Sequence, residues 1–312
     1  MQPSMSLPQR PLSGQPQRRL PGLRLRSFLD RRLPSGPARS VLLGVLAAAV
    51  VTPSLHLADR WLWPTETSTP AIDLTLLQFV GTEFDLLDRG SFRTEELELV
   101  SSPGQEYGTY LRVTYPEGSS SPTSARVEGT PMGGAQFYLD ASGSSSDHQF
   151  LRYFVRLSPD FDFVRGGLLP GLYGGAATGA ADGEPGLATR FGWTEDGRGQ
   201  VYTYASARGA ESEPLGAGSW SWPVDRWACV EQEVHLGRPG DSDGQIRVWL
   251  DDTEVWADDA LQLRDTRALE IEGVFFSTFF GGSDATWATP RTQWADFAGV
   301  RVSDERVGCS TR

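Results

Sequence analysis

Short runs of β-type residues, separated by clusters of turn residues, fill the chain from about residue 72 onward. The sequence has 35 Gly and 21 Pro among 312 residues and shows no helical heptads. Many short strands at this spacing predict an all-β domain over residues 72–306, an antiparallel β-sandwich or β-jelly roll. The expected strands are Thr109–Tyr115, Ala135–Leu139, Phe150–Leu157, Thr189–Thr194, Gln200–Ala205, Trp227–Leu236, Gln245–Leu250, Val274–Phe280 and Trp294–Val302.

A different kind of sequence precedes this domain. Residues 1–39 are rich in Pro, Gln, Ser and Arg and are expected to form a basic, disordered cytoplasmic tail. Residues 40–60 are expected to form one transmembrane signal-anchor helix, because 40–58 carry no formal charge and a basic segment precedes them. A cleaved signal peptide is the alternative, and residues 61–71 are expected to be a linker. Both alternatives predict an exported C-terminal domain, either anchored to the membrane or secreted.

Charge is divided unevenly along the chain and limits the possible partners. Residues 1–60 carry nine Arg against two Asp, a net of +7, so the rest must carry −19 to reach the total of −12. An acidic exported domain repels nucleic acid, which is excluded as a partner, and its membrane contact is expected only through the N-terminal helix. All 28 basic residues are Arg.

The sequence indicates neither a metal nor a cofactor. It has two Cys and three scattered His without ligand spacing, and no phosphate-binding loop stands out. Cys229 and Cys309 both lie in the expected exported part, where a disulfide between them is one possibility and two separate thiols are the other.

Four segments carry a resemblance to a known family. Residues 151–175 begin with a strand-like alternation and continue into Gly166-Gly-Leu-Leu-Pro-Gly-Leu-Tyr-Gly-Gly175, where we expect a turn that presents a loop. Arg226-Trp-Ala-Cys-Val-Glu-Gln-Glu-Val, Asp243-Gly-Gln-Ile-Arg-Val-Trp-Leu-Asp and Val274-Phe-Phe-Ser-Thr-Phe-Phe-Gly-Gly-Ser-Asp follow in order. Over about residues 148–302 the set resembles polysaccharide lyase family 14, whose members include alginate and glucuronan-type lyases.

The resemblance implies cleavage of a uronic-acid polysaccharide by β-elimination. It also implies a catalytic lysine, a Ser-x-Arg pair and a Tyr-x-Tyr pair. Arg190, Tyr202 and Tyr204 match, whereas Leu168 stands at the lysine position and Ala188 at the serine position. Arg190 is expected to hold the substrate carboxylate, and the tyrosines to act as base and acid. Residues two apart on a strand share a face, so both pairs can meet on one sheet.

Other residues are candidates for contacts with the sugar. Arg165, Gln232 and Ser277 are expected to bind substrate, with Thr278, Trp287 and Trp294 as further sugar contacts and His148 as a possible proton-transfer group. Two alternatives to a lyase stay open. One is a catalytically impaired carbohydrate-binding protein on the same scaffold, because of Leu168 and Ala188. The other is a sandwich hydrolase that uses Glu231 and Glu233.

Overall fold

The computed structural model describes residues 78–310 other than 105–106, 142, 144, 179–183 and 210–211. The predicted tail (1–39), anchor or signal helix (40–60) and linker (61–71) lie outside the described residues. Within the described part, no helix is both long and apolar enough to cross a bilayer.

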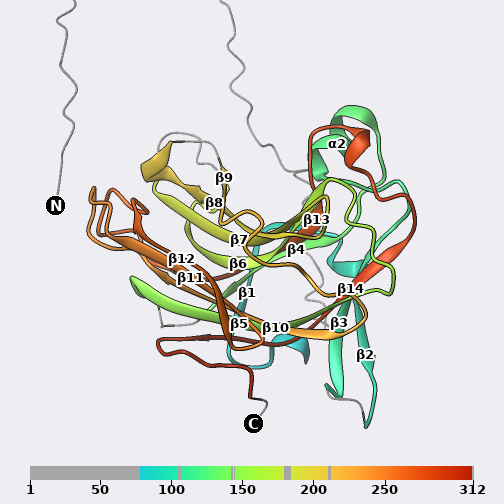
Figure 1. Cartoon of the computed structure of the whole chain (residues 1–312), viewed down its shortest axis with the longest axis horizontal. Helices are drawn as coiled ribbons and strands as arrows, with labels where there is room; N and C mark the ends of the chain where they lie inside the picture. Colours follow the sequence, from blue (N-terminus) through green and yellow to red (C-terminus); the bar gives the residue numbers. More distant parts are fainter. Residues whose placement is uncertain are drawn as a thin grey trace, which may run out of the picture. The chain divides into compact units, whose positions relative to one another are not determined.

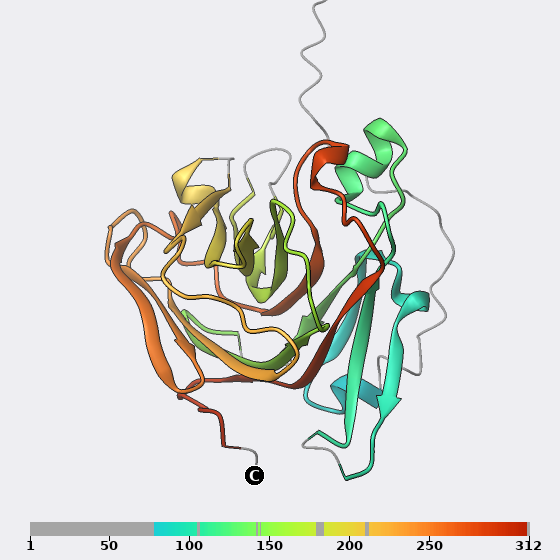
Figure 2. The same ribbon diagram turned by 45° about the vertical axis from the view of Figure 1, so that its right-hand side comes forward.

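The strands form two seven-stranded antiparallel sheets, seen as two layers in Figures 1 and 2. Sheet A has the order β1 (Asp85–Phe92), β4 (Ala135–Asp140), β13 (Gly273–Phe280), β6 (Gly166–Gly175), β7 (Gly186–Thr194), β8 (Gly199–Ala205) and β9 (Glu213–Leu215). Sheet B has the order β12 (Thr253–Leu261), β11 (Gly244–Leu250), β10 (Trp227–His235), β5 (His148–Leu157), β14 (Gln293–Ser303), β3 (Thr109–Tyr115) and β2 (Glu98–Ser101). The helical segments are short: η1 (Thr94–Glu96), α2 (Pro122–Glu128), η2 (Ser206–Arg208) and η3 (Ala285–Trp287).

The predicted all-β sandwich is confirmed. Each of the nine expected strands overlaps an observed strand, while β1, β2, β6, β9 and β12 were not anticipated. β12 is mostly exposed and carries Glu254, Asp258 and Asp259, so it lacks the apolar alternation that marks a half-buried strand.

The expected loop within residues 166–175 is wrong, because these residues form β6, a strand between β13 and β7. The strand tolerates Pro170 because the pairing with both neighbours shifts register between Leu168 and Gly171. Proline cannot donate to a β ladder and is accommodated where the ladder is interrupted. Gly171 is required by the close approach of β7, since a Cβ there would lie 2.1 Å from the carbonyl oxygen of Thr189.

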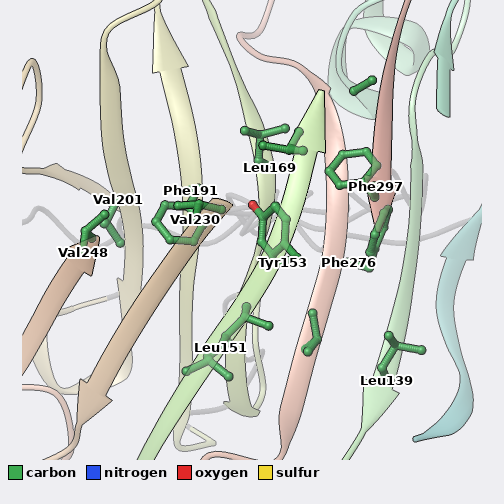
Figure 3. Packing of buried hydrophobic residues seen from close by; sticks show 14 of the residues in the cluster. Leu139, Leu151, Tyr153, Leu169, Phe191, Val201, Val230, Val248, Phe276 and Phe297 are labelled. Carbon is green, nitrogen blue, oxygen red and sulfur yellow. The ribbon is translucent and has the colours of Figure 1, made fainter. Parts of the chain in front are cut away.

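The inward faces of the two sheets form one apolar core (Figure 3). Phe276 of sheet A stacks on Phe137, with ring centroids 4.4 Å apart, and meets Phe297 of sheet B edge-on at 4.9 Å. Tyr153 of β5 lies in the same layer, and its hydroxyl donates to the carbonyl of Pro170 at 3.1 Å. These side chains join the sheets across the middle of the sandwich.

The C-terminal segment is fixed against the outer side of sheet B (Figure 1). Cys309 forms a disulfide with Cys229 of β10. The carboxylate of Glu231 accepts the backbone N–H groups of Val307 and Gly308, and it pairs with Arg306 at 3.3 Å. The chain end therefore covers a carboxylate that would otherwise lie on the surface of the sheet.

Truncation of Phe276 tests the core. We expect Phe276→Ala to lower the free energy of unfolding by about 3–5 kcal/mol, because it removes a fully buried ring and leaves a cavity. Equilibrium urea unfolding measures the loss. Val127→Ala is the control, since Val127 is 67% exposed and its truncation should change stability by less than about 0.5 kcal/mol. A loss below about 1 kcal/mol for Phe276→Ala would contradict this account of the core.

Candidate functional site

Three sequence-predicted site residues meet on the outer face of sheet A. Phe191 of β7 and Val201 of β8 point into the core, so their neighbours Arg190 and Tyr202 point outward. Arg190 stands directly opposite Tyr202 in the β7–β8 ladder. Tyr204 lies two residues beyond Tyr202 on the same face. We call this surface the Arg190 face.

The Arg190 face also holds the positions of the two departures from the family pattern. Leu168 of β6 stands opposite Gly192 on one side and Phe279 on the other, and Gly192 shares the outward face with Arg190. Ala188 stands between Tyr173 and Tyr204. Strand β6 thus brings the expected lysine position to the Arg190 face, although the side chain there is apolar.

The Arg190 guanidinium is buried and held by a chain of polar groups. Its side chain is 8% exposed, and Nη1 donates to Ser277 Oγ at 3.3 Å. Ser277 in turn donates to Gln136 Oε1 at 2.9 Å, and Gln136 Nε2 donates to the carbonyl of Gly90 at 2.6 Å. This chain orients the guanidinium without neutralising it.

No carboxylate pairs with Arg190 among the residues that the structure describes. Burial lowers the pKa of Arg190 to about 10, and the guanidinium therefore remains charged at neutral pH. Its Nε has no hydrogen-bond partner among the described groups. A buried, charged and incompletely bonded guanidinium is suited to an external carboxylate.

A cavity of about 200 Å³ adjoins this chain at the β1 edge of the sheet. It is lined by Arg89, Gly90, Tyr138 and residues 175–178. Arg89 lies over the rings of Tyr138 and Tyr173 and pairs with Glu272 at 3.5 Å. Burial raises the pKa of both tyrosine hydroxyls, so these two groups stay protonated and are unsuited to act as a base.

The sequence did not single out Gln136 or Arg89. Gln136 had one available signal, because it is a polar residue inside an otherwise apolar expected strand, Ala135–Leu139. Arg89 lies in a segment where no strand was expected, so nothing in the sequence placed it near the site.

Two of the predicted substrate-binding residues are not part of this cluster. Arg165 is exposed just before β6, where Nη1 donates to Thr286 Oγ1 at 2.6 Å and the guanidinium lies 4.7 Å from the ring of Trp287. Gln232 is a correction: it was expected to face a sugar-binding groove, but it is fully buried between the sheets beside Val230 and Val234. Strand β10 turns this side chain inward because its alternate neighbours belong to the core.

The remaining candidates also lie elsewhere. Thr278 faces the core and bonds the Tyr115 hydroxyl at 2.5 Å. Trp294 lies against Arg112 on the outer face of sheet B.

His148 bonds Glu233 at 2.8 Å on the outer face of sheet B, where Glu231 is covered by the chain end. The structure does not bring the Glu231 and Glu233 pair to the Arg190 face. Among the described residues, no group of three His, Cys, Asp or Glu side chains is placed to hold a metal ion.

Comparisons with known proteins identify the family of the chain. The sequence model named Polysaccharide lyase 14 matches residues 104–300. The chain belongs to polysaccharide lyase family 14. A comparison with curated proteins found no match.

Solved structures of alginate lyases share the fold. The marine PL-14 alginate lyase from Aplysia kurodai is 28% identical, with a TM-score of 0.58 over 69% of this chain and 89% of that one. Alginate lyase vAL-1 from Chlorella virus is 21% identical, with a TM-score of 0.58 over 74% and 96%. A mutant of alginate lyase Aly36B in complex with alginate trisaccharide is 22% identical, with a TM-score of 0.55 over 70% and 88%.

The burial of Arg190 has a measurable effect on stability. Because the cation has a lower pKa in the folded protein than in the unfolded chain, the unfavourable contribution of Arg190 to stability should fade as the pH increases above about 10. At neutral pH, Arg190→Met should raise the free energy of unfolding by on the order of 1 kcal/mol, since an apolar side chain avoids the desolvation of the charge. Urea unfolding measures the change, with the exposed Arg267→Met as control. A stability loss in Arg190→Met alone would contradict the interpretation of Arg190 as an uncompensated cation.

Proposed function

We propose that this protein is a polysaccharide lyase that cleaves a uronic-acid polysaccharide of the alginate or glucuronan type by β-elimination. The observation that carries the proposal is the buried Arg190 guanidinium, which has no carboxylate partner among the described residues and stands opposite Tyr202. Membership of the family and the alginate lyases among its structural relatives support the same reaction class. The partner is then an acidic polysaccharide.

In this proposal each step of the reaction is assigned to a residue of the Arg190 face. Arg190 holds the uronate carboxylate and stabilises the negative charge that develops when the neighbouring C5 proton is removed. One tyrosine, as phenolate, takes that proton, and a tyrosine hydroxyl gives a proton to the departing glycosidic oxygen. The C4–O bond breaks and a C4=C5 double bond forms, so the products are a new reducing end and an unsaturated uronate end.

The Arg190 guanidinium carbon lies 5.7 Å from the Tyr202 ring. Tyr202 is therefore the better candidate for the base, and Tyr204 for the acid. In this arrangement Arg190 serves both the substrate carboxylate and the base.

A carbohydrate-binding protein without turnover is the second candidate function. The observation in its favour is that Leu168 and Ala188 both lie on the Arg190 face, at the positions where the family resemblance implies a lysine and a serine. Leucine neither neutralises charge nor transfers a proton. Binding through Arg190 would remain even if the elimination did not proceed.

We also propose that the β-sandwich is exported, through residues 40–60 acting as an anchor or as a cleaved signal. The Cys229–Cys309 disulfide supports this location, because disulfides persist mainly in oxidising compartments.

The first test of the reaction is Arg190→Ala. The variant should form unsaturated ends from alginate or glucuronan at least about 100-fold more slowly than the unaltered chain, because it lacks the group that stabilises the developing charge. Ultraviolet absorbance of the unsaturated uronate follows the products. Arg198→Ala is the matched control, an exposed arginine in the turn of the same hairpin. Equal rates for Arg190→Ala and the unaltered chain would overturn the assignment.

The two departures from the family pattern permit a gain-of-function test. We expect Leu168→Lys with Ala188→Ser to increase the rate of elimination, because a second cation would then lie on the Arg190 face. The same absorbance assay measures the rate, and glycan binding is measured in parallel. An unaltered chain that binds the polymer without turnover, together with an active double variant, would favour the binding-protein candidate. A double variant that folds but is slower than the unaltered chain would contradict a catalytic role for position 168.

A further inference from the structure

A second pocket lies on the opposite side of the sandwich from the Arg190 face. It has a volume of about 370 Å³ and is lined by Glu83, Tyr107, Arg152, Phe154 and residues 299–301. Arg152 and Phe154 flank the core residue Tyr153 on β5, so both point to the outer side of sheet B. The volume falls within the range of about 300–1,000 Å³ that is usual for small-molecule sites.

Arg152 is the most unusual group in this pocket. Its side chain is 8% exposed, yet among the described residues it has no carboxylate within ion-pair distance. Nη1 donates to the carbonyl of Gly299 at 2.8 Å, while Nε is buried without a described hydrogen-bond partner. The guanidinium lies 4.7 Å from the ring of Phe154. A buried cation whose contacts are a carbonyl and an aromatic ring carries a desolvation cost in free energy, and a bound anion would offset this cost.

The natural counter-ion for Arg152 is already engaged. Glu231 stands directly opposite Arg152 in the β5–β10 ladder. Its carboxylate is occupied by the backbone N–H groups of Val307 and Gly308 and by Arg306. The C-terminal segment, which the disulfide holds in place, therefore engages this carboxylate, and Glu231 forms no ion pair with Arg152.

A second cation adds to the charge of the pocket. Arg301 is exposed, stands opposite Arg152 in the β5–β14 ladder, and has no ion pair within the described ranges. Glu83 is the one acidic residue in the lining, so two guanidiniums face a single carboxylate. Tyr107 and Phe154, whose ring centroids lie 4.5 Å apart, form an aromatic wall beside them.

We infer that this pocket binds a uronic-acid residue, whose carboxylate is held by Arg152 and Arg301 while its ring packs against Tyr107. The pocket would be a second polysaccharide site, separate from the Arg190 face. Two guanidiniums select for a carboxylate, and aromatic side chains supply rigid apolar surface beside it. The identity of the sugar rests on the proposed function, whereas the preference for a carboxylate rests on the pocket alone.

The test uses the full chain with Arg190→Ala, which removes the proposed carboxylate anchor of the first face. An alginate trisaccharide is the probe, and calorimetry measures its binding. Adding Arg301→Glu should weaken the remaining binding at least tenfold, because Arg301 is exposed and its reversal should not disturb folding. Arg267→Glu in the same background is the matched control and should leave the binding unchanged. Arg152→Gln should weaken binding in the same direction as Arg301→Glu.

Three results would overturn the inference. They are unchanged trisaccharide affinity in Arg301→Glu, equal affinity for a neutral cellulose trisaccharide, and binding of inorganic sulfate without binding of the trisaccharide. Hydrogen exchange separates this site from the first one, since the trisaccharide should protect residues 299–303 in a chain with Arg190→Ala. That protection is independent of turnover. If the unaltered chain forms no unsaturated ends but protection persists, the proposed reaction fails and the second site stands.

Discussion

Burial of one face of each sheet against the other is the constraint on which the rest of this structure depends. The contact of Phe276 with Phe137 and Phe297 holds the two layers together. Once these side chains face inward, the two-residue period of a strand places their neighbours along the strand on the outer face. Arg190 and Tyr202 meet for this reason, because their neighbours Phe191 and Val201 are held in the core.

The outer faces of the two sheets share one electrostatic feature. Each carries an arginine that is 8% exposed, Arg190 on sheet A and Arg152 on sheet B, and neither has a carboxylate partner in the part of the chain that the structure describes. In an acidic protein, with a net charge of −12, counter-ions for arginine are abundant. The absence of a carboxylate partner at these two arginines therefore distinguishes their sites from the rest of the surface. Both sites are suited to anionic ligands.

The C-terminal segment links the fold to the second of these sites. The disulfide holds Cys309 beside β10, and the backbone of the same segment binds Glu231. This arrangement supplies a buried carboxylate with peptide N–H donors. It also leaves Arg152 with only the Gly299 carbonyl as a described hydrogen-bond acceptor.

The sequence by itself determined the fold class, the positions of most strands and the shared face of Tyr202 and Tyr204. Alternating apolar residues and turn clusters are local signals, and the shared face of residues two apart follows from strand geometry alone. Only the tertiary structure decided that residues 166–175 form a strand, that Gln232 faces the core, and that Gln136 and Arg89 stand beside the site. These outcomes depend on which strands become neighbours and which side of each faces the other sheet, and that choice is made by contacts between residues far apart in the chain.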